Sequence, residues 1–360
     1  MAEFANWNGY LLAPNSSAPD DPVEQSFYIQ DLERPSLAYL DGSRQLIAEV
    51  AESETAFRSG KPVGARYRRT VGSIARLIAG TQVGLALGGG AAWGWAHIGV
   101  LAALEANGIP VDMIAGCSMG SVIGGLRSAG LSIADLEEIA GYWRNRKARF
   151  VEWRLWRFCL LNERVVNKVF RGYFGNRQVN QTEVPYWANA VDIRAGREFT
   201  LREGSLVDCV RASIALPGLL PPLDHGKELL LDASVSDPVP VRLVRKMGAR
   251  FIVAVNAMVP PEAQKMTLRY PFNLLEILHR CMFVMGHEIG QAGAERSADV
   301  VFTPDLTHIN MLQFGRSPEI IQSGRLAAEQ RMPAIQAMYA RRKAQVCGED
   351  AATASLSFGY

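Results

Sequence analysis

The five residues 116–120, "GCSMG", contain a serine whose surroundings suit a nucleophile. They follow the apolar run 111–115 and precede a helical run, so the sequence predicts a strand, a sharp turn and a helix. In such a GxSxG turn the serine takes a strained backbone conformation, and Gly116 and Gly120 leave room where side chains would collide. The hydroxyl of Ser118 would lie at the positive end of the helix, which favours developing negative charge. A glycine-bounded turn in which Ser118 only caps the helix is the alternative.

A glycine-rich loop, "LGGGAAWG" at 87–94, also leaves a predicted strand and opens a predicted helix. Because two consecutive units of this kind in a parallel sheet bring their loops together at the carboxyl ends of the strands, we expect this loop to lie beside Ser118. Its amides would stabilise the oxyanion formed when Ser118 attacks a carbonyl, each donor contributing roughly 2.7 to 4 kcal/mol. The candidate donors are the backbone amides of Gly88, Gly89, Gly90 and Ala91.

The same glycine run has two other interpretations. It does not match a dinucleotide fingerprint, because Trp93 takes the place of the last glycine, and no GK[ST] follows as a P-loop would require. A purely structural tight turn remains the alternative.

Asp232 is the candidate base, because "ELLLDAS" at 228–234 places its carboxylate at the carboxyl end of an apolar strand. An aspartate with an ordinary pKa of about 3.9 is a poor base, but burial would raise that pKa and let the group accept and later return a proton. An aspartate that merely caps a turn before Pro238 is the alternative.

A serine–histidine–acid triad is less favoured, because no histidine after Ser118 occupies a glycine-bounded turn after a strand. Those histidines are His225, His279, His287 and His308.

Alternating strand-like and helical runs must position these residues. Several of the apolar runs are hydrophobic on both faces, which is typical of strands in a sheet that is covered on both sides. The sequence therefore predicts a three-layer α/β/α fold with a mainly parallel central sheet. Predicted strands cover 82–87, 111–115, 187–193, 228–231, 251–257 and 299–304, and predicted helices cover 95–107 and 119–129. The run 318–346 suits one amphipathic helix or a pair of helices.

The bulk composition suits a packed globular protein and disfavours several classes. A net charge of +2 over 360 residues gives no global reason to expect a nucleic-acid partner. The five cysteines form no CxxC pair, so we predict no disulfide framework and no metal site, and a reducing compartment fits best. The apolar stretch 83–104 approaches the length of a bilayer span, but its three consecutive glycines favour a strand and a helix instead. The N-terminus lacks the basic and apolar regions of a secretory signal.

The chain is predicted to divide into three parts. Residues 1–80 open with a Pro/Ser/Asp-rich stretch and continue with charged segments, so we interpret them as a partly helical, linker-like N-terminal extension. Residues 81–345 form the α/β domain, and residues 346–360 form a C-terminal tail.

Five motifs in the same order resemble the patatin-like phospholipase family, in particular its bacterial and neuropathy-target-esterase-like branch. They are "GGGAAWGWAHIGVL", "GCSMGSVIGGL", "RASIALPGLLPP", "LLLDASVSDPVPVRLVRKMGA" and "ADVVFTPDL", and the likeness runs from about residue 83 to residue 324. The resemblance implies a serine hydrolase of phospholipids or lysophospholipids, with a Ser118–Asp232 dyad and with Gly88, Gly89 and Gly90 in the oxyanion loop. It implies no metal and no cofactor, and it leaves open whether the chain forms a homo-oligomer.

Two positions depart from the family pattern. Trp93 stands where the family usually has arginine or lysine, and Ala233-Ser234 stand where it usually has Gly-Gly or Gly-Ala after the dyad aspartate. An alanine held at positive φ would cost about 1 to 2 kcal/mol and could displace Asp232. The rival hypothesis is therefore a patatin-like protein with weak or no catalysis that binds lipid or a partner.

The segment 142–171 combines nine basic residues, against two glutamates, with several aromatic ones. On a helix such residues suit an anionic membrane surface, where each cation contributes about 1 kcal/mol. A solvated face is the alternative, and the rest of the chain gives little support to stacking on single-stranded nucleic acid. We therefore expect a cytoplasmic enzyme that binds the membrane peripherally. The candidate membrane-binding residues are Arg144, Arg146, Lys147, Arg149, Trp153 and Trp156.

Overall fold

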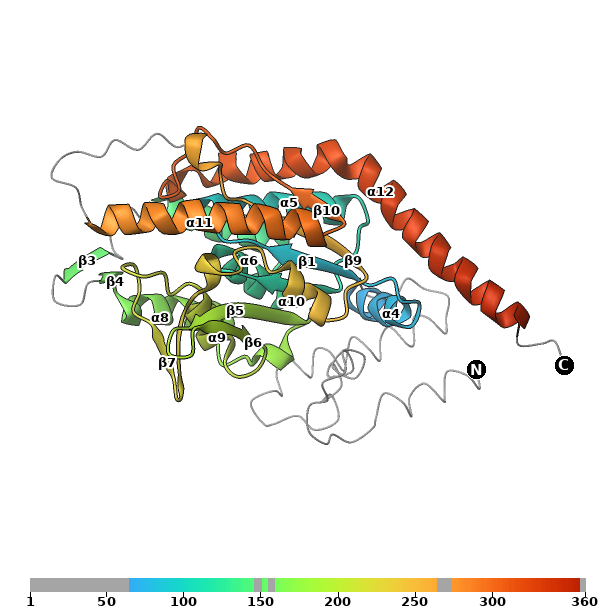
Figure 1. The fold of residues 1–360 in the computed structure, drawn as a ribbon, viewed down its shortest axis with the longest axis horizontal. Coiled ribbons are helices and arrows are strands. Elements are labelled where there is room, and N and C mark those ends of the chain that lie inside the picture. The colour runs from blue at the N-terminus through green and yellow to red at the C-terminus, as the bar shows by residue number, and fades with distance from the viewer. Residues whose placement is uncertain (1–64, 146–150, 155–158, 264–273, 357–360) are drawn as a thin grey trace. The chain divides into compact units, whose positions relative to one another are not determined.

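The computed structural model describes residues 65–145, 151–154, 159–263 and 274–356 (Figure 1). The chain divides into two compact units, one of residues 1–82 with 343–360 and one of residues 83–342. The described part of the first unit includes helix α4 (Ala65–Ile78). The second unit contains the central sheet with Ser118 and Asp232.

An eight-stranded mixed sheet forms the centre of the second unit. Its parallel part runs in the order β10 (Val300–Phe302), β9 (Phe251–Val255), β1 (Val83–Leu87), β2 (Met113–Gly116) and β5 (Tyr186–Asp192). The antiparallel part consists of β8 (Glu228–Asp232) beside β5, β7 (Leu223–His225) beside β8, and β6 (Arg197–Leu201) on the other edge of β5. The mainly parallel sheet predicted from the sequence is therefore confirmed, with antiparallel strands at one side.

Strands β2 and β8 lie end to end along one edge of β5. Gly116 at the end of β2 pairs with Ala188, and Asp232 at the end of β8 pairs with Ala190. Strand β6 pairs with β5 from Ala188 onward and so occupies the opposite edge. Because β2 runs parallel to β5 and β8 runs antiparallel to it, the carboxyl ends of β2 and β8 point at each other. Strand β5 therefore brings together the turn that holds Ser118 and the turn that begins at Asp232.

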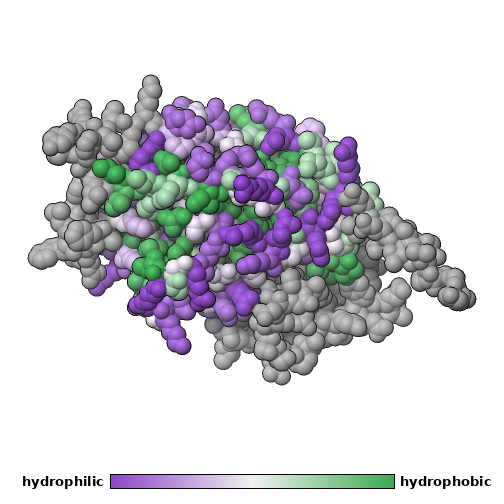
Figure 2. All heavy atoms as spheres, in the orientation of Figure 1, coloured by the Kyte–Doolittle hydropathy of each residue, from purple (hydrophilic) through white to green (hydrophobic). Residues whose placement is uncertain are grey.

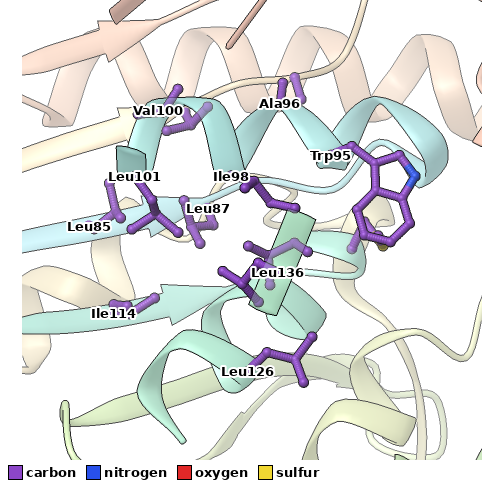
Figure 3. Packing of buried hydrophobic residues seen from close by; sticks show 14 of the residues in the cluster. Leu85, Leu87, Trp95, Ala96, Ile98, Val100, Leu101, Ile114, Leu126 and Leu136 are labelled. Atoms are coloured by element: carbon purple, nitrogen blue, oxygen red, sulfur yellow. The ribbon is translucent and has the colours of Figure 1, made fainter. Parts of the chain in front are cut away.

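Alternate residues of the central strands point into two separate cores, as expected for a sheet covered on both faces. Leu85 and Leu87 belong to the larger core, whereas Ala86 between them belongs to the smaller one. Figure 3 shows Leu85 and Leu87 under Ile98 and Leu101 in the larger core. The larger core includes α5 (Ala96–Ala106), α6 (Met119–Ser128), α7 (Ile133–Asn145), α9 (Leu206–Ser213) and α12 (Ser317–Leu356), and the smaller one includes α10 (Val241–Lys246) and part of α11 (Leu274–Ser297). The predicted three-layer α/β/α fold is confirmed.

The described part of the basic and aromatic segment contains two helix portions and a hairpin. Helix α7 ends at Asn145, an antiparallel hairpin of β3 (Val151–Arg154) and β4 (Cys159–Leu161) follows, and α8 (Glu163–Phe174) begins after it. Arg144 lies in the last turn of α7 and Trp153 lies in β3. The candidates Arg146, Lys147, Arg149 and Trp156 lie outside the described residues, so the membrane-binding role of this segment stays a prediction.

The C-terminal helix is longer than predicted. Helix α12 runs from Ser317 to Leu356, with Pro333 inside it, and so includes positions that the sequence assigned to a tail. Within the described ranges, no helix is long and apolar enough to cross a membrane. The described residues of the second unit also include five short 3₁₀ helices, namely η3 (Ala91–Trp95), η4 (Val179–Gln181), η5 (Ala233–Val235), η6 (Pro261–Ala263) and η7 (Phe314–Arg316).

Candidate active site

Ser118 lies in a strained turn between β2 and α6. Its backbone has φ 50° and ψ −122°, in the positive-φ region that residues with a side chain rarely adopt. Ser118 is partly exposed, while its neighbours Cys117 and Met119 are both buried. Its amide donates a hydrogen bond to Oγ of Ser213, at 3.0 Å. The turn therefore exposes one polar side chain, that of the serine.

Gly116 and Gly120 let this turn pack against the end of β1. A Cβ atom at Gly120 would lie 2.1 Å from the carbonyl oxygen of Leu87, and one at Gly116 would lie 2.5 Å from the carbonyl oxygen of Gly120. Real Cβ contacts are essentially never this short, so a larger residue at Gly120 would push the turn away from β1, and one at Gly116 would collide with the start of α6. The spacing of the two glycines thus has a direct steric reason.

The glycine-rich loop meets Ser118 at the adjacent strand end. A Cβ atom at Gly89 would lie 3.4 Å from Cβ of Ser118 and 2.7 Å from Oγ of Ser234. The amide of Cys117 also donates to the carbonyl of Leu87, at 3.0 Å. The loop, the serine turn and the turn after Asp232 therefore converge at one point.

The hydrogen bonds of this loop narrow the set of candidate oxyanion donors. The amide of Gly88 donates to the carbonyl of Val255 at 3.0 Å, and that of Gly89 donates to the carbonyl of Pro238 at 2.9 Å. Both residues are buried. Gly90 and Ala91 are partly exposed, and their amides donate to no acceptor in the part of the chain that the structure describes. Of the four predicted donors, these two are free to bind an oxyanion.

Trp93 anchors the loop through contacts that a charged residue would not make. It is buried, its Nε1 donates to the carbonyl of Ile309 at 2.8 Å, and its ring lies 5.4 Å from that of Phe283. The departure from the family pattern at this position therefore replaces a cation with a packed indole.

His97 supports the loop from the first turn of α5, a role that sequence reasoning missed. Its Nε2 donates to the carbonyl of Gly88 at 2.8 Å, and burial lowers the pKa of the ring to about 4, so the imidazole is neutral at neutral pH. The sequence feature that could have indicated this role is that His97 is a lone histidine within the apolar stretch 83–104.

The carboxylate of Asp232 is buried, and its two oxygens have different environments. Oδ1 accepts hydrogen bonds from the amide of Ser234 at 2.8 Å and from its hydroxyl at 2.7 Å. Oδ2 has no hydrogen-bond partner among the described residues. Burial raises the pKa of Asp232 above its ordinary value, while the side chains of Ser118 and Ser234 lower it. One oxygen thus caps η5, as the turn-capping alternative expected, and the other stays available.

Ala233 does not carry the backbone strain that its place in the motif led us to expect. Ala233 begins η5, and the non-glycine residues with positive φ in the described chain are Ala91 and Ser118. The strain in this region therefore lies in the candidate catalytic loops. The sequence alone did not assign roles to Ser213 and Ser234, although both lie inside the quoted motifs.

The histidines after Ser118 make contacts elsewhere. His279 donates to the carbonyl of Pro217 at 2.7 Å, and His308 lies 2.8 Å from Glu319. His225 packs edge-on against Phe199, and His287 lies 3.7 Å from Glu288. In the described part of the chain, no histidine hydrogen-bonds to Ser118, and no group of three or more metal-ligating side chains is placed to hold an ion.

A three-layer α/β fold in which a strained serine faces a loop with free amides is an arrangement typical of serine hydrolases with a nucleophile elbow. Residues 85–245 match the patatin-like phospholipase family, and this range includes both Ser118 and Asp232. Over this range the chain is similar to the patatin-like phospholipase family.

Curated relatives agree with this similarity. The chain is 38 % identical over 190 residues to lysophospholipase NTE1 of Cryptococcus neoformans, a match that covers 51 % of this chain and 12 % of the relative. It is 34 % identical over 189 residues to patatin-like phospholipase domain-containing protein 6 of Homo sapiens, covering 51 % and 14 %. The match thus spans about an eighth of the length of these relatives. Among solved structures, VipD from Legionella pneumophila aligns with a TM-score of 0.34 at 10 % identity over 68 % of this chain and 67 % of that one, a likeness too weak to carry an argument.

Proposed function

We propose that this chain hydrolyses acyl esters of phospholipids or lysophospholipids, with Ser118 as nucleophile and Asp232 as base. The observation that carries the proposal is the buried carboxylate of Asp232, which has one oxygen held by Ser234 and the other unpaired, and whose pKa responds to the Ser118 side chain. The names of the relatives, which include lysophospholipases, support the substrate class.

In the first half of the reaction, Asp232 takes the hydroxyl proton of Ser118 while Oγ attacks the ester carbonyl. The electron pair of the carbonyl moves onto its oxygen, which accepts hydrogen bonds from the amides of Gly90 and Ala91. When the tetrahedral intermediate collapses, the bond to the alcohol breaks and protonated Asp232 gives its proton to the departing oxygen. The products are the free alcohol and an acyl group on Ser118.

In the second half, Asp232 takes a proton from water as the water oxygen attacks the acyl carbonyl. Collapse of this second intermediate releases the fatty acid, and the proton returns to Oγ of Ser118. The raised pKa of Asp232 favours both halves, because a carboxylate that binds protons more tightly is a stronger base.

Replacement of either dyad residue tests the proposal. We expect Ser118→Ala and Asp232→Asn each to lower the turnover of a chromogenic acyl ester and of phosphatidylcholine by at least about a thousandfold. Ser323→Ala and Asp224→Asn are matched controls, because Ser323 donates to the carbonyl of Asp305 and the exposed Asp224 lies near Arg194 and not at the dyad, and they should keep wild-type turnover. Wild-type turnover in either dyad variant would contradict the dyad.

A fluorophosphonate probe separates this proposal from a catalytically silent lipid-binding protein. Attack by an activated serine on phosphorus expels fluoride and leaves a covalent label. We expect rapid labelling of the wild type at Ser118 and none in Ser118→Ala, measured by intact mass. A wild-type chain that stays unlabelled would favour the silent protein.

A further inference from the structure

Helix α11 presents large apolar side chains to solvent. Leu278, Met285 and Ile289 are 50 %, 50 % and 42 % exposed, and Cys281 is exposed beside them. Their spacing of i, i+3, i+7 and i+11 puts them on one face of the helix. Leu312, in the segment before η7, is 64 % exposed. We call these five residues the apolar rim, and Figure 2 shows exposed hydrophobic atoms over the first half of α11.

The packed side of α11 touches the candidate active site. A Cβ atom at Gly286 would lie 2.6 Å from the carbonyl oxygen of Ser234, whose amide and hydroxyl hold Asp232. One turn earlier, Phe283 packs against Trp93 of the glycine-rich loop. The helix that carries most of the rim therefore borders both candidate catalytic loops.

The segment around Leu312 is tied to the same loop. The carbonyl of Ile309 accepts from Trp93, and the carbonyl of Met311 accepts from the amide of Ala92 at 2.9 Å. Ala92 directly follows the candidate oxyanion donor Ala91. Leu312 thus lies one residue from a backbone contact with the loop, so both segments that carry the rim contact the glycine-rich loop.

The exposed part of α11 is almost free of formal charge. Between residues 277 and 289 the charged side chains are Arg280 and Glu288. The guanidinium of Arg280 is engaged with the protein, because it donates to the carbonyl of Pro261 and lies over the ring of Phe283. This surface therefore has little charge with which to attract an anionic partner. The driving force for binding here would be the burial of its apolar side chains.

We propose that the apolar rim inserts into the surface of a phospholipid bilayer and so brings the active site to its substrate. This inference rests on the proposed function, because the acyl esters of a phospholipid lie at the boundary between head groups and acyl chains. A helix that lies in this interface buries its apolar face by about 5 to 10 Å, which reaches that boundary. Contiguous exposed apolar patches on a monomer mark binding sites of this kind. Because the rim lacks charge, it binds zwitterionic phosphatidylcholine, and added salt does not release it.

Sedimentation with phosphatidylcholine vesicles tests the rim. The full chain carries Ser118→Ala in this experiment, so that the lipid is not consumed. We expect Leu278→Gln and Met285→Gln each to weaken vesicle partitioning by about tenfold, because each removes one large apolar group from the bilayer. Met338→Gln is the matched control, since Met338 is 40 % exposed on α12 more than five helical turns after its start. It should bind like the parent, and 0.5 M salt should leave the parent bound.

Three results would overturn the proposal. One is partitioning of the two rim variants equal to that of the parent. Another is binding that salt abolishes, which would assign the membrane contact to basic residues. The third is a concentration-dependent dimer that Met285→Gln dissolves without changing vesicle binding, which would show that a second copy covers the rim.

A comparison of substrates separates this proposal from the proposed function. In chains with Ser118 intact, the rim variants should lower the ratio of vesicle turnover to soluble-ester turnover by about tenfold, and Met338→Gln should keep the wild-type ratio. If the wild type hydrolyses no ester and the Ser118→Ala chain still binds vesicles through the rim, the proposed function fails and the docking surface stands.

Discussion

At Asp232, opposing effects act on one carboxyl group. Burial raises its pKa, whereas the side chains of Ser118 and Ser234 and the amide of Ser234 lower it. Ser234 donates both of its hydrogen bonds to Oδ1, so it stabilises the charged form without using the oxygen that remains for Ser118. The side chain that replaces the usual small residue at this position thus adjusts the base.

Removal of the Ser234 hydroxyl should move the acidic limb of the pH profile. Asp232 must be ionised to accept the proton of Ser118, so kcat/KM rises as pH rises through the pKa of Asp232. Ser234→Ala removes a donor to the charged form and raises that pKa further, so the acidic limb shifts to higher pH. Turnover of a soluble ester between pH 4 and 9 measures the shift. Ser236→Ala, which loses only a long contact to the carbonyl of Ala233, is the control.

An acidic limb that stays in place or moves to lower pH in Ser234→Ala would contradict this role. A purely structural effect would lower kcat/KM at every pH and leave the limb where it was.

Residue types and spacing were enough to predict Ser118, Asp232 and the glycine-rich loop as candidates. They could not show which amides of the loop are free, because Gly88 and Gly89 donate to Val255 and Pro238, which are distant in sequence. The backbone conformation of Ala233 could not be predicted from the sequence either, since its φ depends on how η5 packs and not on the residue alone.

Helices α5 and α12 approach each other through two glycines. A Cβ atom at Gly99 would lie 1.9 Å from the carbonyl oxygen of Ile321, and one at Gly324 would lie 2.0 Å from the carbonyl oxygen of Ala96. Backbone therefore lies against backbone where α12 crosses the helix that follows the glycine-rich loop. A methyl group at either position must push the helices apart.

Two glycine-to-alanine substitutions with the same helix-propensity gain should have opposite effects. Gly324→Ala overpacks the contact with α5 and should lower the free energy of unfolding by about 1 to 3 kcal/mol. Gly172→Ala in α8 meets no atom within 4 Å and should be neutral or stabilise by up to about 1 kcal/mol. Urea unfolding measures both values. If the free energy of unfolding of Gly324→Ala equals that of Gly172→Ala, α12 does not pack closely against α5 in solution.

Long apolar runs predicted six strands of the sheet, namely β1, β2, β5, β8, β9 and β10, and the helices α5, α6 and α12. The β3–β4 hairpin was missed because its basic and aromatic residues lack an apolar period that separates a strand from a helix. The antiparallel direction of β8 was also not predictable, because strand direction depends on the path of the chain between elements.

The stability of the whole molecule should depend on pH through Asp237, an acid whose side chain is only partly exposed. Burial and the nearby Glu198 raise the pKa of Asp237 to about 6, although Arg242 and Lys246 act in the opposite direction. The folded chain therefore binds a proton more tightly at this position than the unfolded chain does. The free energy of unfolding contributed by this group falls as pH rises from about 4 to about 6, and stays lower above that range.

Asp237→Asn should stabilise the fold at neutral pH. The amide carries no charge to desolvate, so the variant should gain on the order of 1 to 3 kcal/mol at pH 7 to 8, and the gain should vanish below about pH 4. Thermal unfolding of the variant and the wild type at pH 4, 6 and 8 measures the difference. Asp224→Asn at an exposed position serves as the control, and a lower melting temperature of Asp237→Asn at pH 8 would contradict the prediction.

The end-to-end meeting of β2 and β8 along β5 has a consequence for biosynthesis. Ribosomes deliver Ser118 first, and Asp232 leaves on the order of a hundred residues later, roughly ten seconds at cellular translation rates. During that interval the serine has no carboxylate beside it, because the strand that supplies the proposed base has not been made. If Asp232 is the base, as we propose, an unfinished chain is inert toward lipid, and lipolysis starts only after the ribosome has passed β8.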